Sequence, residues 1–334
     1  MKRIQEALNE KILILDGPMG TMIQNENLKE EDYRGKKFES SSISLKGNND
    51  ILNLTQEKII YDIHTKYLSA GADIIETNTF NSTKTSQFDY KCEDFSYDLN
   101  FSGGKIARKA VDDFLIKNPN ETKYVAGVLG PTNRTCSMSP DVNNPGFRNI
   151  SFDELYSDYE KSSEALIEAG VDVIMVETVF DTLNAKAALS AIGGACKKSK
   201  KNIPIMISAT ITDLSGRTLS GQTIEAFYNS ILHVDPLSVG LNCALGPKEL
   251  EPYIIELDRI SESFISVHPN AGLPNAFGEY DETPDSMANF AKKWSQNGYI
   301  NIIGGCCGAT PDHINLMAQK VRNIKPRKKK TFDP

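Results

Sequence analysis

The 334-residue sequence predicts an α/β fold, a (β/α)8 TIM barrel in which helices surround a closed parallel sheet. Eight short runs rich in Val and Ile have the composition of strands that are buried on both faces. Stretches with helical spacing of apolar residues lie between these runs, so strand and helix alternate along the chain. Polar and glycine-rich residues directly follow the runs, as in barrels whose strand ends converge on one face. An open doubly wound sheet would spread these residues along an edge, so the barrel is favoured.

The expected strands are short and follow one another at regular intervals. They cover residues 12–15, 74–77, 125–129, 171–176, 205–209, 238–241, 264–267 and 300–303. Helices are expected between them, among others at residues 57–70, 152–169, 184–197, 225–232 and 248–260. We expect one barrel domain over residues 1–324 and a basic tail over residues 325–334. The tail is either a solvated end or linker, or a segment that docks on the barrel.

Three helix starts carry a proline in the first turn, where its missing N–H costs no hydrogen bond. Thr283 precedes Pro284, and Thr310 precedes Pro311, so each threonine offers a capping hydroxyl. Gly246-Pro247 begins the expected helix before residue 260.

Composition excludes several classes of function. Hydrophobic residues make up 40% and charged residues 24% of the chain, as in ordinary globular proteins. A net charge of -7 argues against nucleic acid as a partner, since such binding needs clustered Lys and Arg. No apolar run reaches the roughly 18 to 20 residues that span a bilayer. With no secretion signal and six cysteines, we expect a cytoplasmic protein with reduced thiols and a small ligand.

Three cysteines follow expected strands and are candidate metal ligands. Cys306 and Cys307 lie in a Gly-Gly-Cys-Cys-Gly turn after the eighth strand, and Cys243 follows the sixth. The flanking glycines permit backbone conformations that turn both neighbouring sulfurs toward one centre. Three thiolates with one open position suit a catalytic zinc ion, which would hold an incoming thiol as a thiolate. Inert thiols or a regulatory disulfide are the alternatives.

The chain resembles the homocysteine S-methyltransferases in several long motifs. They cover residues 15–24, 45–50, 76–82, 127–135, 177–186 and 268–280, besides the cysteine elements. Within that family they are similar to the N-terminal, homocysteine-binding module of cobalamin-dependent methionine synthase. The likeness extends from about Ile12 to Ile314. It implies a (β/α)8 barrel, zinc held by Cys243, Cys306 and Cys307, and transfer of a methyl group to homocysteine.

The resemblance also implies a substrate site. An acidic pair, Asp16 and Glu177, would bind the ammonium group of homocysteine. The backbone amides around Gly17, Met19 and Gly20 would receive its carboxylate, because this turn leaves N–H groups free. A further candidate is Asn270, as a ligand of the open zinc position when substrate is absent or as a structural turn residue. His268 and His313 are candidate bases, yet a metal-bound thiol needs little help in losing its proton, so we interpret both as structural.

The methyl donor implied by the resemblance is methylcobalamin, whose methyl group originates from 5-methyltetrahydrofolate. Both would be bound by cobalamin and folate modules outside this sequence, with residues 325–334 as the linker to them. Two alternatives stay open. One is a stand-alone, cobalamin-independent enzyme that uses S-methylmethionine or a similar donor. The other is a zinc-dependent protein that binds thiols without turnover.

Overall fold

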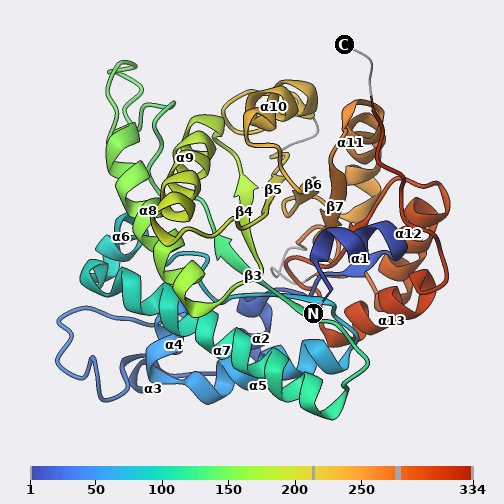
Figure 1. Ribbon diagram of the computed structural model, residues 1–334. Coiled ribbons are helices and arrows are strands. Elements are labelled where there is room, and N and C mark those ends of the chain that lie inside the picture. The colour runs from blue at the N-terminus through green and yellow to red at the C-terminus, as the bar shows by residue number, and fades with distance from the viewer. Residues whose placement is uncertain (1, 213–214, 275–279, 332–334) are drawn as a thin grey trace.

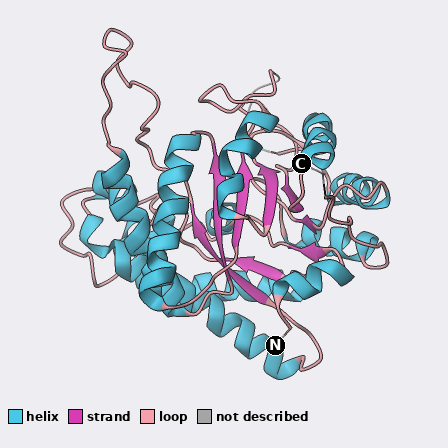
Figure 2. Cartoon of the chain, turned by 45° about the horizontal axis from the view of Figure 1, so that its top comes forward, coloured by secondary structure: helices cyan, strands magenta, loops and turns pink. Residues whose placement is uncertain are grey.

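The computed structural model describes residues 2–212, 215–274 and 280–331. Residues 275–279, inside the 268–280 motif, and residues 332–334 of the expected tail lie outside the described residues. The described residues form an eight-stranded parallel sheet with helices around it (Figure 1, Figure 2). The predicted (β/α)8 barrel is confirmed.

The strands are hydrogen-bonded in the order β1-β8-β7-β6-β5-β4-β3-β2. A parallel bridge between Leu15 and Ile74 joins β1 to β2, and Asp73 N donates to Ile14 O at 2.7 Å. These contacts bring the two ends of the sheet together and close the barrel. The strand bounds are β1 Leu13–Ile14, β2 Ile74–Glu76, β3 Tyr124–Leu129, β4 Val173–Val179, β5 Ile205–Ala209, β6 Ser238–Asn242, β7 Phe264–His268 and β8 Ile302–Ile303.

All eight predicted runs contain or overlap a strand. The run at 205–209 has the predicted bounds, whereas β4 continues three residues beyond residue 176. This extension contains a register shift against β5 between Val176 and Val179. Glu177 lies within this irregular segment, at the carboxyl end of the barrel, where the polar residues gather.

Thirteen α-helices occur in the described part of the chain, including the five that periodicity predicts and two more that begin at Pro284 and Pro311. Thr283 accepts a hydrogen bond from Ser286 N, which confirms its capping role. Their bounds are α1 Ile4–Glu10, α2 Met19–Asn25, α3 Glu30–Arg34, α4 Leu52–Thr55, α5 Glu57–Ser69, α6 Lys84–Gln87, α7 Ser96–Lys117, α8 Phe152–Ala169, α9 Thr182–Ser199, α10 Ile224–Ile231, α11 Pro247–Ile260, α12 Pro284–Gln296 and α13 Pro311–Val321. None of these helices combines the length and apolar character that a membrane crossing requires.

The barrel interior is filled by alternate strand residues, because successive side chains of a strand point to opposite faces. The inner cluster includes Leu13, Tyr124, Met175, Met206 and Phe264. Helix α1 contributes its buried residues to the same cluster, so it covers the amino-terminal end of the barrel. The carboxyl ends of the strands are left for the polar residues of the site.

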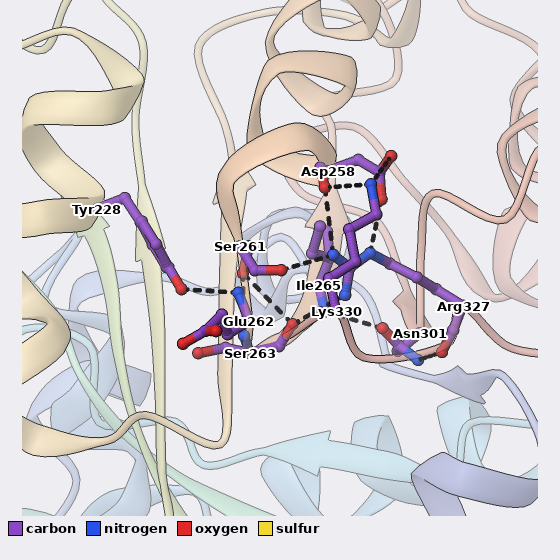
Figure 3. A network of polar contacts seen from close by, with 9 residues as sticks. All are labelled: Tyr228, Asp258, Ser261, Glu262, Ser263, Ile265, Asn301, Arg327 and Lys330. Atoms are coloured by element: carbon purple, nitrogen blue, oxygen red, sulfur yellow. Dashed lines mark hydrogen bonds and ion pairs between the residues drawn. The ribbon is translucent and has the colours of Figure 1, made fainter. Parts of the chain in front are cut away.

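The chain after α13 returns to the barrel. Arg327 is 3% exposed, and its Nε donates to Asp258 Oδ1 at 2.7 Å near the end of α11 (Figure 3). Other guanidinium hydrogens reach the carbonyl oxygens of Asp258, Ser261 and Ser263. Lys330 Nζ also reaches Asp258, whereas Lys328 and Lys329 are exposed. Arg327 and Lys330 of the expected tail therefore dock on the barrel.

Candidate active site

The three predicted cysteines meet at the carboxyl ends of β6 and β8. Their sulfurs lie within 4.8 Å of one another, and Cys243 Sγ is 3.9 Å from Cys307 Sγ. Zinc–sulfur bonds of about 2.3 Å in a tetrahedron place two sulfurs about 3.8 Å apart. The donor set and its spacing therefore fit a zinc ion.

The local backbone conformation orients the cysteine sulfurs toward one another. Cys243 has φ 60° and Ala244 has φ 54°, a left-handed turn that is uncommon for residues with a Cβ. Cys243 N donates to His268 O at 3.3 Å, and Cys306 N donates to Pro269 O at 2.7 Å. Both cysteine segments are thus tied to the end of β7, which lies between β6 and β8 in the sheet.

A cluster of acidic residues occupies the same end of the barrel. A carboxylate oxygen of Glu76, a carboxylate oxygen of Glu177 and a ring nitrogen of His268 lie within 4.8 Å of one another. Glu177 Oε2 is 3.7 Å from His268 Nε2. Asp16 is 1% exposed, and its Oδ2 accepts a hydrogen bond from Glu76 N at 3.1 Å. Three carboxyl groups therefore converge on this region, from β2, β4 and the end of β1.

Several polar atoms of this cluster have no hydrogen-bond partner, although they are buried. They are Asp16 Oδ1, Glu76 Oε1 and both ring nitrogens of His268. A buried polar atom without a partner costs about 1 to 3 kcal/mol. Such atoms are typical of a site whose ligand completes the hydrogen bonds.

Burial is the largest influence on two of these acids. It raises the pKa of Asp16 and of Glu76 well above the usual carboxyl range, and the charge of Glu177 acts in the same direction. Without a ligand, like charges at this spacing oppose ionisation. A cationic group entering the cluster would relieve this repulsion, so the region is suited to binding an ammonium group.

The position of Glu177 is set by a strained turn and an amide. Thr178 has φ 56°, which is rare for a β-branched residue. Asn242 stabilises this conformation, since its Oδ1 accepts from Thr178 N at 3.1 Å and its Nδ2 donates to Glu177 Oε2 at 3.2 Å. Ser208 Oγ donates to the same Oδ1 at 2.7 Å and fixes the orientation of the amide.

Helix α2 begins beside this acidic cluster. Pro18 is its N-cap and provides no side-chain cap, so the first-turn N–H groups receive no hydrogen bond from that side chain. A Cβ at Gly17 would approach Tyr67 to 2.8 Å, so the close packing of Tyr67 requires glycine there. Tyr67 Oη in turn donates to Pro18 O at 3.2 Å and holds the start of the helix.

One cleft of about 430 Å3 connects the two groups of residues. Its lining includes all three cysteines, Gly17, Met19, Gly20, Glu76, Glu177, His268 and Tyr280. Asp16 precedes Gly17 in the chain and accepts the hydrogen bond from Glu76 N. Asn270 is 3% exposed, and its buried Oδ1 has no hydrogen-bond partner. The structure thus brings all the predicted site residues to one end of the barrel.

The model of the homocysteine S-methyltransferase family matches residues 13–321 of this chain. The chain belongs to the homocysteine S-methyltransferase family. The match covers the whole barrel, from β1 to the end of α13, including every residue of the cleft. Family membership makes the chain a methyltransferase.

Solved structures share the fold of this homocysteine S-methyltransferase family member. The metallated form of the homocysteine methyltransferase MmuM from Escherichia coli is 21% identical, with a TM-score of 0.72. The match covers 95% of this chain and 99% of that one. The oxidised form of MmuM is 20% identical, with a TM-score of 0.70, over 92% of this chain and 96% of that one. Identity at this level shows the common fold.

Three contributors to this candidate site were not among the sequence-based candidates. Glu76 is the third acid, Asn242 positions Glu177, and Tyr280 lines the cleft beside Cys307. Glu76 and Asn242 each stand at the end of a predicted strand, which was the available signal. His313 is part of a capping box with Thr310, and its Nε2 contacts Glu282 O at 3.0 Å. This arrangement agrees with the structural interpretation of His313.

Proposed function

We propose that this chain is the zinc-dependent homocysteine-binding module of a cobalamin-dependent methionine synthase. Homocysteine would bind in the cleft and receive the methyl group of methylcobalamin to give methionine. Family membership and the metallated form of MmuM among the related structures support a metal-dependent methyl transfer to homocysteine. The choice of methylcobalamin as donor rests on the motifs shared with methionine synthase.

The observation that carries the proposal is the presence of a sulfur cluster and an acidic cluster in one cleft. Homocysteine is a thiol at one end and an ammonium carboxylate at the other. A site that binds it needs a group for each end, at the distance the molecule spans. The cleft of about 430 Å3 provides both groups.

Cys243, Cys306 and Cys307 would hold the zinc ion, and all three line the cleft. When bound, zinc would supply Lewis acidity that favours the thiolate form of the homocysteine sulfur at neutral pH. Asn270 stays a proposed ligand of the open position in the absence of substrate. Its buried Oδ1, which has no hydrogen-bond partner, supports that role.

The acidic residues would orient the other end of homocysteine. Glu177 and Asp16 are proposed to bind the ammonium group, and Glu177 is held for this purpose by Asn242. The N–H groups at Gly17, Met19 and Gly20 are proposed to bind the carboxylate, supported by the absence of a side-chain cap on α2. With both groups anchored, the sulfur is directed toward the cysteines. It attacks the methyl carbon, and the bonding electrons of the methyl group leave with the donor.

The first experiment combines zinc analysis with calorimetry of homocysteine binding across pH, on the purified chain and on chain stripped by a chelator. We expect one zinc per chain, release of a proton on binding, and loss of binding on stripping. Homocysteine binding that is unaffected by zinc removal would contradict the proposal.

A second experiment identifies the donor. Methionine formation is measured with methylcobalamin and, separately, with S-methylmethionine in the absence of cobalamin. Turnover with methylcobalamin supports the proposed module. Turnover with S-methylmethionine alone would instead support a stand-alone enzyme, and tight homocysteine binding without any turnover would support a thiol-binding protein.

A further inference from the structure

His268 is the last residue of β7 and lines the acidic end of the cleft. It is 1% exposed, and neither of its ring nitrogens has a hydrogen-bond partner. Its Nε2 lies 3.7 Å from Glu177 Oε2, which is beyond hydrogen-bond distance. A carboxylate oxygen of Glu76 lies within 4.8 Å of the ligand atoms of both residues, and Glu76 Oε1 is also buried without a partner. Buried polar atoms that lack partners therefore converge on the space between these three side chains.

Two carboxylates and one imidazole are the ligands of a divalent cation that prefers oxygen and nitrogen. Carboxylate oxygen suits Mn²⁺, and imidazole nitrogen suits transition metals such as iron and zinc. Bonds of about 2.1 Å to such ligands place neighbouring ligand atoms about 3.0 to 3.5 Å apart. The distance of 3.7 Å between Glu177 Oε2 and His268 Nε2 is close to this spacing. All three residues line the cleft, so a cation and its water ligands have a path from solvent.

The protein itself does not balance the negative charge of this cluster. Asp16 adds a third carboxyl group, whose Oδ1 is buried without a hydrogen-bond partner. Among the described residues, the lining of the cleft includes no lysine or arginine. Buried charges require a partner of opposite charge, and a divalent cation offers twice the charge of an ammonium group. Asn242 Nδ2 already orients Glu177, so one ligand is held in place before a cation enters.

From this arrangement we propose a second cation site, in which Glu76, Glu177 and His268 bind a divalent cation of the Mn²⁺ class and water completes the coordination. The site is distinct from the cysteine cluster, because thiolates select zinc and carboxylates select Mn²⁺. Glu177 is also the proposed ligand of the substrate ammonium group, so the cation and homocysteine compete for it. The competition rests on the proposed function, whereas cation binding does not. Divalent cations would thereby regulate the access of homocysteine to the cleft.

The test titrates Mn²⁺ into the zinc-loaded chain and follows free Mn²⁺ by electron paramagnetic resonance. We expect one Mn²⁺ bound per chain without loss of zinc. At a Mn²⁺ concentration about ten times its own dissociation constant, the apparent dissociation constant of homocysteine should rise about 10-fold, because the two ligands exclude each other. The affinity for 4-mercaptobutanoate, which has no ammonium group, should stay unchanged.

Two variants assign the ligands of this cation. Glu76→Gln keeps the size of the side chain and removes its charge, and His268→Ala removes the imidazole. Each should weaken Mn²⁺ binding by about 10-fold or more and leave one zinc per chain. Glu76→Gln decides the question if His268→Ala does not fold. His233→Ala is the matched control, since His233 is exposed in the short helix Leu232–Val234, and it should bind Mn²⁺ like the unaltered chain.

The outcomes separate the cation site from the proposed function. Absence of Mn²⁺ binding, or equal Mn²⁺ binding by Glu76→Gln and the unaltered chain, would overturn the cation site. Bound Mn²⁺ that leaves the homocysteine affinity unchanged would overturn the competition. Failure of the zinc-loaded chain to bind homocysteine in the absence of Mn²⁺ would instead overturn the proposed function, while the Mn²⁺ titration still decides the cation site.

Discussion

Asn242 donates a hydrogen bond from its Nδ2 to Glu177 Oε2 at 3.2 Å, and Cys243 is the next residue in the chain. A single segment at the end of β6 therefore positions one candidate zinc ligand and one candidate ligand of the substrate ammonium group. Because Asn242 and Cys243 are neighbours in the chain, the cysteine cluster and the acidic cluster share this segment of backbone. Displacement of either group is expected to affect binding at the other.

The role of Glu177 in binding the ammonium group can be tested with Glu177→Gln. The variant keeps the size of the side chain and removes its charge, so homocysteine affinity should fall about 10-fold to 100-fold, equivalent to about 1.4 to 2.8 kcal/mol. The affinity for 4-mercaptobutanoate, which lacks the ammonium group, should change far less. Calorimetry with both thiols measures the difference, and Glu164→Gln on the surface of α8 is the control. An equal loss for both thiols would show that Glu177 does not recognise the ammonium group.

Zinc binding by the cysteine cluster can be tested with Cys306→Ala. Loss of one of three sulfur ligands should abolish stoichiometric zinc while the barrel stays folded, because the sulfur lies at the end of the strands and outside the core. Metal analysis and circular dichroism measure the two properties. Cys196→Ala is the control, since Cys196 lies near the end of α9 and outside the cluster. Full zinc content in Cys306→Ala would refute the ligand assignment.

Docking of the segment after α13 can be tested with Arg327→Ala. Removal of this guanidinium leaves the buried carbonyls of Ser261 and Ser263 without its hydrogen bonds and Asp258 with Lys330 alone. Breaking a buried pair typically costs about 3 to 5 kcal/mol, and the remaining lysine should keep the loss near 3 kcal/mol. Urea unfolding measures it, with the exposed Lys328→Ala as control. A change below about 0.5 kcal/mol would mean that the docking contributes no stability.

Asp50 should make stability depend on pH. Burial raises its pKa from 3.8 to about 7 in the folded chain, although Ser82 and Asn81 donate hydrogen bonds to it. The folded state thus holds this proton more tightly than the unfolded state. The contribution of this proton to the free energy of unfolding is fully present below about pH 4. It is lost as the pH rises to about 7, and the total loss is at most about 4 kcal/mol.

Asp50→Asn removes this ionisation, so its stability relative to the unaltered chain should increase between pH 5 and pH 8. Urea unfolding at both pH values measures the change. Glu39→Gln, at an exposed position, should show no such pH dependence relative to the unaltered chain. A constant difference between Asp50→Asn and the unaltered chain at the two pH values would rule out an elevated pKa.

The strands were predictable because their signal is local. A run such as residues 205–209 is apolar throughout and is bounded by polar residues, and the structure gives it the same limits. Helix α7 has no counterpart among the expected helices named above, and Gly103 and Gly104 in its middle lower helix propensity. Tertiary packing explains both glycines. A Cβ at Gly103 would approach Thr79 to 2.6 Å, and one at Gly104 would approach Ala169 to 2.6 Å.

By itself, the sequence determined the class of fold, the choice of three cysteines as candidate metal ligands, and the end of each strand at which polar residues gather. These features could be predicted because periodicity and turn chemistry are properties of neighbouring residues. Only the tertiary structure decided that Glu76 joins Asp16 and Glu177, that Tyr280 lines one cleft with Cys307, and that Arg327 docks on α11. These contacts join residues far apart in the chain. Their existence depends on barrel closure and on the burial of each charged or polar group, neither of which is set within a short stretch of sequence.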